Sequence, residues 1–255
     1  MATKLGKIRV DVLLVERGLA PSRERAQALL LAGHVRVNGE KVDKAGSQIA
    51  PDARVELAGE GPRYASRGGD KLAGALEDFG ISPEGRVCAD VGSSTGGFTD
   101  CLLQNGAKKV YAVDVTPRQM DWKLQQDPRV ALIEKNARYL KAEDLPEAAS
   151  LVVMDVSFIS AAKVVPALAA VAAPGADLLV LVKPQFELER RDVGRGGIVR
   201  DTALHERAVE RVRVAAREAG LEVAGVKPSR VTGAEGNQEY FLHARRAGRI
   251  ESANP

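Results

Sequence analysis

The chain has 255 residues, a length that suits one large domain or a small module joined to a medium one. Hydrophobic residues make up 45% of it and charged residues 28%, which is ordinary for a soluble globular protein, and the net charge of +3 is only a weak basic bias. Its most apolar long window, 161–182, contains a lysine, an aspartate, a glycine and two prolines, which excludes a bilayer span of about 20 apolar residues.

The sequence shows no sign of secretion or of a metal site. Lys4, Lys7 and Arg9 lead into a charged, helical stretch and not into the apolar core of a signal peptide. The only cysteines, Cys88 and Cys101, lie outside any C-x-x-C pair or histidine cluster, so we expect both to be reduced core residues. We therefore expect a cytoplasmic protein that binds no metal, no membrane and no stable protein partner.

Residues 1–58 have the pattern of a separate small module. Ser22 occupies the position of a helix N-cap, and Gly33 is placed to end that helix. Asn38 and Gly39 favour the left-handed turn of a β-hairpin between two alternating strands. The expected elements are a helix over 10–17, a helix over 23–31 and a hairpin over 35–42.

Two short helices that lead into a small β-ribbon resemble the alpha-L RNA-binding module of ribosomal proteins and some RNA methyltransferases. The residues that carry this resemblance are Arg23, Arg25, Ala26, Leu30, Gly33, Val35, Val37, Asn38 and Gly39. The module also has ten lysines and arginines against seven acids, an excess typical of a nucleic-acid surface, although solvated surface charge explains it equally well. The resemblance implies that Arg23, Arg25 and Arg36 contact RNA phosphates.

The rest of the chain alternates helices and strands after a linker at 59–66, whose composition favours a loop. Such alternation predicts a doubly wound α/β domain over 67–246 with a mostly parallel, seven-stranded sheet, followed by a tail at 247–255. The last two strands are too close in sequence for a helical crossover, so the final strand should be antiparallel. The expected strands are 86–91, 109–115, 130–134, 151–156, 178–182, 221–227 and 239–244, and the expected helices are 71–79, 98–105, 117–124, 161–172 and 204–219.

A glycine-rich turn, 90–97, connects the first strand of this domain to its next helix. Such a turn lets a ligand approach the backbone and the free N–H groups of the helix N-terminus. Its pattern is Asp-x-Gly-x-x-x-Gly-Gly and not the G-x-G-x-x-G of a dinucleotide site. The carboxylate of Asp90 would repel phosphate but pair with a cation, so S-adenosylmethionine and methyl transfer are favoured over hydride transfer. The cofactor contacts expected in this turn are Asp90, Gly92, Ser93, Gly96, Gly97 and Phe98.

Polar residues follow several of the expected strands, where ligands bind in open α/β sheets. Asp114 lies 24 positions after Asp90 and suits ribose hydroxyls, although a turn-forming role explains it too. Asn136, after the third strand, is a weaker candidate for contact with adenine. Asp155 ends the next apolar strand and should face both cofactor and substrate. Lys183 ends the strand after that, where a purely structural lysine would normally extend to solvent.

Four of the charged residues complete a recognisable set. Lys71, Asp155, Lys183 and Glu239 match the Lys-Asp-Lys-Glu tetrad of ribose 2′-O-methyltransferases related to FtsJ. The stretches around them and the glycine turn resemble the TlyA family over nearly the whole chain: 67–72, 90–100, 155–160, 182–187 and 236–241. That family is associated with ribose methylation of bacterial ribosomal RNA and has also carried the label haemolysin.

The resemblance implies a ribosomal RNA 2′-O-methyltransferase that uses S-adenosylmethionine and acts on ribosomal RNA or subunits. Lys183 would be the general base, or at least the group that contacts the 2′-oxygen. Lys71 and Glu239 would orient the ribose and Lys183, and Asp155 would lie between cofactor and base. Arg67 and Arg195 are further candidates for RNA contact, although the basic loop around Arg195 is equally typical of a solvated loop.

Three other functions compete with this interpretation. A membrane-lysing haemolysin would need an apolar span or a strongly amphipathic cationic helix, and neither is visible. A non-catalytic ribosome-assembly factor would not need an intact tetrad. Pseudouridine synthesis, found in other chains with this N-terminal module, requires an Arg-Leu-Asp motif that is absent here.

Overall fold

The computed structural model describes residues 6–57, 63–233 and 236–248. The chain divides into two compact units, Met1–Arg63 and Tyr64–Pro255, and each has its own apolar core. Within the described residues no helix is both long enough and apolar enough to cross a membrane.

Over its described residues, 6–57 and 63, the first unit contains two helices and two small antiparallel sheets. Ser22 caps the second helix by accepting a hydrogen bond from the backbone of Arg25. Asn38 and Gly39 both have positive φ, 52° and 87°, as the left-handed hairpin turn requires. The sheets are β3-β2-β5 and β1-β4. The elements are β1 (Ile8–Arg9), α1 (Val10–Glu16), α2 (Arg23–Leu31), β2 (Val35–Val37), β3 (Glu40–Lys41), β4 (Gln48–Ile49) and β5 (Val55–Leu57).

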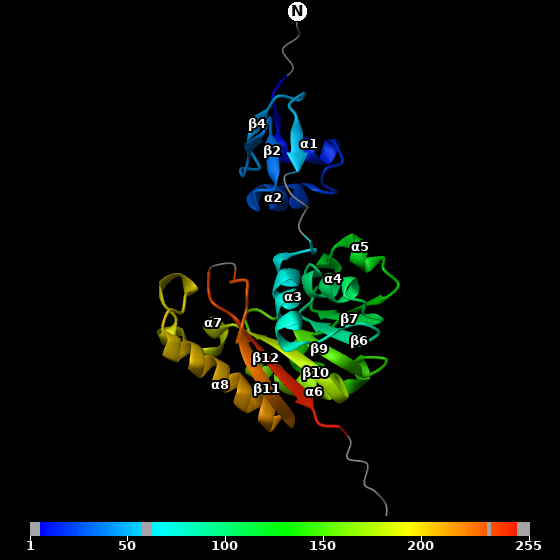
Figure 1. Cartoon of the computed structure of the whole chain (residues 1–255), viewed down its shortest axis with the longest axis vertical. Helices are drawn as coiled ribbons and strands as arrows, with labels where there is room; N and C mark the ends of the chain where they lie inside the picture. Colours follow the sequence, from blue (N-terminus) through cyan, green and yellow to red (C-terminus); the bar gives the residue numbers. More distant parts are fainter. Residues whose placement is uncertain (1–5, 58–62, 234–235, 249–255) are drawn as a thin grey trace, which may run out of the picture. The chain divides into compact units, whose positions relative to one another are not determined.

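A seven-stranded sheet forms the centre of the second unit, as predicted, with the order β11-β12-β10-β9-β6-β7-β8 (Figure 1). Six strands run in one direction, and only β12 is antiparallel to its neighbours β10 and β11. The predicted antiparallel final strand is therefore confirmed. The strands are β6 (Val87–Val91), β7 (Lys109–Asp114), β8 (Val130–Glu134), β9 (Ala149–Met154), β10 (Ala172–Val182), β11 (Leu221–Pro228) and β12 (Tyr240–Arg246).

Helices cover both faces of this sheet. Alternate residues of β9 divide between two cores: Leu151 and Val153 pack with α3 and α4, while Val152 and Met154 pack with α6 and α8. Both cysteines are buried in the first of these cores. The helices are α3 (Arg67–Phe79), α4 (Gly97–Gln104), α5 (Trp122–Gln125), α6 (Val165–Val171), α7 (Pro184–Glu187) and α8 (Thr202–Glu218), with short 3-10 helices η1 (Pro117–Gln119), η2 (Ala137–Tyr139), η3 (Ala142–Asp144), η4 (Ala161–Lys163), η5 (Arg190–Asp192) and η6 (Arg195–Gly197).

Several predicted bounds differ from the structure, and two predicted helices are interrupted. The helix expected over 117–124 is divided into η1 and α5, because Met120 and Asp121 have extended backbone conformations. The helix expected over 161–172 is divided into η4 and α6, and β10 begins at Ala172, six residues before the expected start. Ala172 pairs with Ala149, and a register shift precedes Asp177, so Pro174 and Gly175 lie in an irregularity of the strand. Of the predicted linker over 59–66, residues 59–62 lie outside the described residues, and Tyr64 is buried in the core of the second unit.

Candidate active site

The glycine turn leads from β6 into α4 and is built for close backbone contacts. Gly92 has φ +86°, and a Cβ there would lie 2.4 Å from the carbonyl oxygen of Asp155. Gly96, with φ +94°, is the N-cap of α4, and a Cβ there would lie 2.5 Å from a methyl group of Leu124. A side chain at Gly92 would displace the end of β9, whereas a side chain at Gly96 would require the Leu124 side chain to move. The turn therefore holds the end of β6 against the end of β9.

Asp90 lies beneath this turn with a fully buried carboxylate. Its Oδ2 accepts a hydrogen bond of 2.7 Å from the Thr99 hydroxyl, while Oδ1 has no hydrogen-bond partner among the described residues. Burial raises the pKa of the Asp90 carboxyl to about 7, and the nearby charge of Asp155 adds to this effect. A cation beside Oδ1 would satisfy the free oxygen and stabilise the ionised form.

An open cavity of about 610 Å³ lies at the ends of β6, β7 and β9. Asp114 lines it and is fixed by the backbone N–H groups of Ser94 and Thr116, each at 2.9 Å. Asn136 lines it as the N-cap of η2. The volume falls in the range of small-molecule and cofactor sites. The cavity, the free Asp90 oxygen and the close approach at Gly92 together fit a nucleoside ligand that carries a positive charge.

The predicted cofactor residues divide into two groups. Gly92, Asp114, Asn136 and Asp155 are among the residues that line the cavity, whereas the rest of the predicted set does not appear on its wall. The Phe98 side chain packs in the core against Phe241, with ring centroids 6.2 Å apart. Only the backbone of Phe98 remains available to a ligand. The predicted residues away from the wall are Asp90, Ser93, Gly96, Gly97 and Phe98.

Lys183 and Asp155 form an ion pair at the ends of two neighbouring strands. Their Nζ and Oδ1 atoms are 2.6 Å apart, and Lys183 is only 8% exposed. The pairing of Val180 with Met154 brings these strand ends together. Lys183 Nζ also donates a hydrogen bond of 2.8 Å to the Ser157 hydroxyl, a contact that the sequence did not predict. The side chain of Lys183 is thus held by two fixed oxygens.

Lys71 and Glu239 form a second ion pair, with Nζ and Oε2 2.6 Å apart. Val182 is paired with Tyr240, so Glu239, the residue just before β12, lies beside the end of β10, where Lys183 follows. Lys71 extends from α3, which begins four residues before its expected start because Ser66 caps it. The structure therefore arranges the four tetrad residues as two cation–carboxylate pairs, one buried and one with a half-buried carboxylate.

The structure also identifies an exposed aromatic residue that was not among the predicted site residues. Phe158 follows Asp155 by three residues, is 92% exposed and lines the cavity. Its φ of +65° is rare for a residue with a side chain. Nothing in its local sequence signals this conformation.

The predicted RNA-binding arginines have varied surroundings. Arg23 donates to Asp11, which is fully buried and also accepts from Arg9 and Gln27. Arg36 is exposed and donates to the Gly39 carbonyl. In the second unit, Arg67 donates to the Thr232 carbonyl. Arg25 is half-buried on α2, and the side chain of Arg195 lies outside the part of the chain that the structure describes.

Comparison with known proteins gives two family matches. Residues 64–246 match the FtsJ-like methyltransferase family, and residues 8–55 match the S4 domain. The Bacillus subtilis protein YqxC is 47% identical over 242 residues, which cover 93% of this chain and 85% of that protein. The 16S/23S rRNA (cytidine-2′-O)-methyltransferase TlyA of Mycobacterium tuberculosis is 46% identical over 241 residues, covering 94% and 90%. A solved hemolysin-named structure from Streptococcus thermophilus has a TM-score of 0.75 at 42% identity, covering 97% and 93%.

Proposed function

The chain belongs to the FtsJ-like methyltransferase family, and from this premise we propose that it methylates ribose 2′-hydroxyl groups of ribosomal RNA. It is an S-adenosylmethionine-dependent methyltransferase with an N-terminal S4 domain. Two ion pairs support a ribose oxygen as the methyl acceptor: Lys183–Asp155, whose carboxylate lines the cavity, and the buried pair Lys71–Glu239. Relatives such as TlyA, named as an rRNA (cytidine-2′-O)-methyltransferase, support the choice of RNA.

The charges around the cavity suit the binding of the methyl donor. Asp90 provides the free buried oxygen, Asp114 a fixed carboxylate, and Gly92 the space for close approach. When bound there, S-adenosylmethionine supplies a methyl group on a positively charged sulfur. Asn136 and Asp155 complete the set of residues that would hold it.

A ribose hydroxyl is a weak nucleophile until its proton is removed or strongly polarised, and Lys183 is the group we assign to this task. Asp155 and Ser157 fix the position of its nitrogen. The remaining position on that nitrogen serves the 2′-oxygen, either by accepting the hydroxyl proton or by a charged hydrogen bond to the oxygen. Lys71 and Glu239 would orient the ribose. The rest of the rate enhancement would come from alignment of the 2′-oxygen with the methyl group.

The first unit would supply affinity for the RNA. Arg23, Arg25 and Arg36 lie on or beside α2 and the hairpin, the elements that resemble an RNA-binding module. Contacts from these arginines to phosphates would increase affinity without choosing a sequence. The target nucleotide would then be selected by the second unit.

The proposal is tested with the full-length protein, labelled methyl donor and ribosomal RNA, either naked or in subunits. We expect label on ribose 2′-oxygens, loss of transfer in Lys183→Ala, and unchanged binding of S-adenosylmethionine by calorimetry in that variant. Turnover by Lys183→Ala close to that of the wild type would remove Lys183 from the mechanism. Absence of label on any ribosomal RNA, together with dye leakage from liposomes without cofactor, would favour a membrane-active function.

A further inference from the structure

Two smaller pockets continue from the cavity along one side of the second unit. The first, of about 390 Å³, shares Phe158 and Ile159 with the cavity. The second, of about 330 Å³, shares Leu188 and Arg211 with the first. We call them the near pocket and the far pocket. The near pocket is therefore a neighbour of the cavity that Asp155 lines, and the far pocket is a neighbour of the near pocket.

The near pocket has a one-sided charge. Arg138, Lys163 and Arg211 line it, and none of the aspartates or glutamates among the described residues does. Arg138 stacks over the Tyr139 ring at 5.8 Å, and neither Arg138 nor Lys163 has an ion pair within the described part of the chain. Arg211 donates to the Glu187 carbonyl oxygen, with its Nε 4.0 Å from the carboxylate. Two cations without an ion pair, Arg138 and Lys163, thus line this hollow together with Arg211, which already lies near Glu187.

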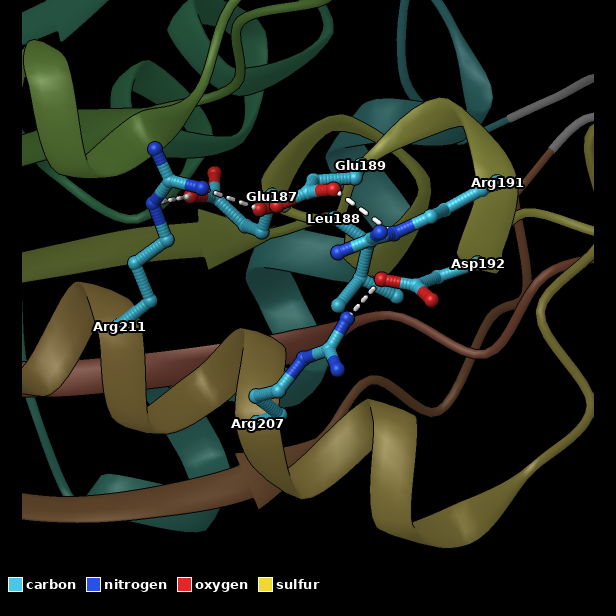
Figure 2. Close-up of a pocket in the computed structure, with 7 residues that line it drawn as sticks. All are labelled: Glu187, Leu188, Glu189, Arg191, Asp192, Arg207 and Arg211. Atoms are coloured by element: carbon cyan, nitrogen blue, oxygen red, sulfur yellow. Dashed lines mark hydrogen bonds and ion pairs between the residues drawn. The ribbon is translucent and has the colours of Figure 1, made fainter.

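The far pocket differs from the near pocket because each of its arginines already lies beside a carboxylate. Figure 2 shows Arg191 beside Glu189, Arg207 beside Asp192 and Arg211 beside Glu187. Three acids therefore face three arginines. An incoming anion would have to displace a carboxylate there, but not in the near pocket. Coulomb attraction for an anion is accordingly strongest in the near pocket.

A second observation indicates that the near pocket has a ligand. Gln185 lines it, and the side-chain oxygen of Gln185 is buried without a hydrogen-bond partner among the described residues. A buried polar atom without a partner costs free energy, and a ligand with a hydrogen to donate would remove that cost. A nucleotide offers both a phosphate for the cations and hydroxyl or amino hydrogens for Gln185.

We propose that the near pocket binds a phosphodiester group of the RNA strand that carries the methylated ribose. Arg138 and Lys163 supply the principal contacts, and Arg211 assists from α8. This inference rests on the proposed RNA substrate and adds a phosphate site that fixes the strand relative to Lys183. The site positions the strand, so its loss should raise KM for RNA far more than it lowers kcat.

The test compares Arg138→Gln/Lys163→Gln with the control Lys141→Gln/Arg213→Gln. The control residues are surface cations that lie beside acids and outside all three hollows. We expect KM for ribosomal RNA to rise about tenfold per lost charge in the first variant. The slope of log affinity against log salt is negative, and its magnitude should decrease by roughly 0.7–0.9 per lost phosphate contact. The affinity for S-adenosylmethionine should not change. Equal salt slopes in the variant and the control would overturn the proposal.

Two further arms separate the possible failures. RNA binding is measured by fluorescence anisotropy without methyl transfer, so a changed slope in a protein that methylates no RNA would leave the pocket standing and reject the proposed function. Normal methylation of RNA with an unchanged salt slope would reject the phosphate site in the near pocket and leave the proposed function standing. Arg207→Gln probes the far pocket, and we expect no change in slope. A shallower salt slope for Arg207→Gln alone would indicate that the phosphate binds in the far pocket, which would overturn the assignment.

Discussion

Lys71 Nζ lies 2.6 Å from Glu239 Oε2, and the two side chains are 10% and 3% exposed. The pair connects α3 to the start of β12 across 168 positions of sequence. A buried ion pair adds little net stability over an apolar pair, but breaking it leaves an uncompensated buried charge. The same two residues belong to the proposed tetrad, so their structural and catalytic roles must be separated.

Single and double variants of this pair make that separation. Lys71→Met or Glu239→Leu alone should destabilise the second unit by about 3–5 kcal/mol, because one charge is left buried without its partner. Lys71→Met/Glu239→Leu should recover most of that loss. Urea unfolding followed by the fluorescence of Trp122, the only tryptophan, measures both effects. We expect the folded double variant to be inactive, and methyl transfer by it would reduce the pair to a structural role.

Asp90 should destabilise the free protein at neutral and higher pH. Burial raises its pKa to about 7, so ionisation in the folded state is penalised, and the penalty grows as pH rises from about 4 to 7. Asp90→Asn keeps the hydrogen bond from Thr99 and removes this penalty, which is at most about 4 kcal/mol. Thermal unfolding at several pH values should show the variant more stable at pH 8 and equal to wild type near pH 4. A lower Tm for the variant at pH 8 would contradict the assignment.

The same carboxyl predicts the pH dependence of cofactor binding. A cation binds the ionised form of Asp90 better, so binding should release a proton and affinity should rise between pH 6 and pH 8. S-adenosylhomocysteine lacks the sulfonium charge and should show a smaller rise. Calorimetry in two buffers of different ionisation enthalpy measures the proton release, which Asp90→Asn should abolish.

Asp177 is a control for Asp90, because the pKa of Asp177 is shifted in the opposite direction. Burial opposes its ionisation, but hydrogen bonds from His243, Arg86 and Arg245 outweigh burial and hold the pKa of Asp177 below its usual value. The stability it contributes is present above the unfolded pKa of about 3.9 and is lost as pH falls further. Asp177→Asn should therefore lower the Tm at pH 7, and the difference from wild type should shrink only below about pH 4.

The Gly92 turn can be tested against another glycine of similar backbone conformation. Gly220 has φ +75° and open space where the methyl group of an alanine would lie, whereas at Gly92 a Cβ would meet the Asp155 carbonyl. Gly220→Ala should cost about 1–2 kcal/mol for the left-handed conformation alone. Gly92→Ala should cost more and weaken S-adenosylmethionine binding, because the end of β9 must move. Equal unfolding free energies for both variants would show that the close approach is unimportant.

The sequence predicted the sheet well because its strands are apolar runs with clear breaks. β8, for instance, has the predicted bounds, and the glycine turn lies where expected. The start of α3 was missed because Gly68 and Gly69 disfavour a helix, while the Tyr64 ring occupies the space beside Gly69. The sequence pattern around Gly69 does not reveal its contact with the Tyr64 ring.

The tetrad residues were predicted, but their pairing was not. Lys71 meets Glu239 only because β12 inserts between β10 and β11, which is a property of the tertiary fold. The near pocket was missed for the same reason, since Arg138, Lys163 and Arg211 come from three separate helices. Asp11 also gave no signal, because a buried aspartate on a short helix has the same pattern as an exposed one.

Asp11 is the last test, and it concerns the first unit alone. Its carboxylate accepts two hydrogen bonds of 2.9 Å from Arg9 and one of 3.2 Å from Arg23, and the Arg9 bonds hold the pKa of Asp11 well below its usual range. Asp11→Asn leaves both arginines without a charged partner and should cost about 1–3 kcal/mol in this unit. The loss should be constant between pH 5 and pH 8, because Asp11 stays ionised throughout in the folded protein and is ionised in the unfolded chain above about pH 4.

The effect of Asp11→Asn should be confined to the first unit and to RNA. The arginines would lose their fixed positions, so RNA affinity should fall, while the Trp122-monitored unfolding of the second unit and S-adenosylmethionine affinity stay unchanged. Asp43→Asn is the matched control, since Asp43 is an exposed carboxylate of the same unit. If Asp43→Asn lowers RNA affinity as much as Asp11→Asn does, the buried carboxylate does not position the arginines. A changed S-adenosylmethionine affinity in Asp11→Asn would instead show that the two units are coupled.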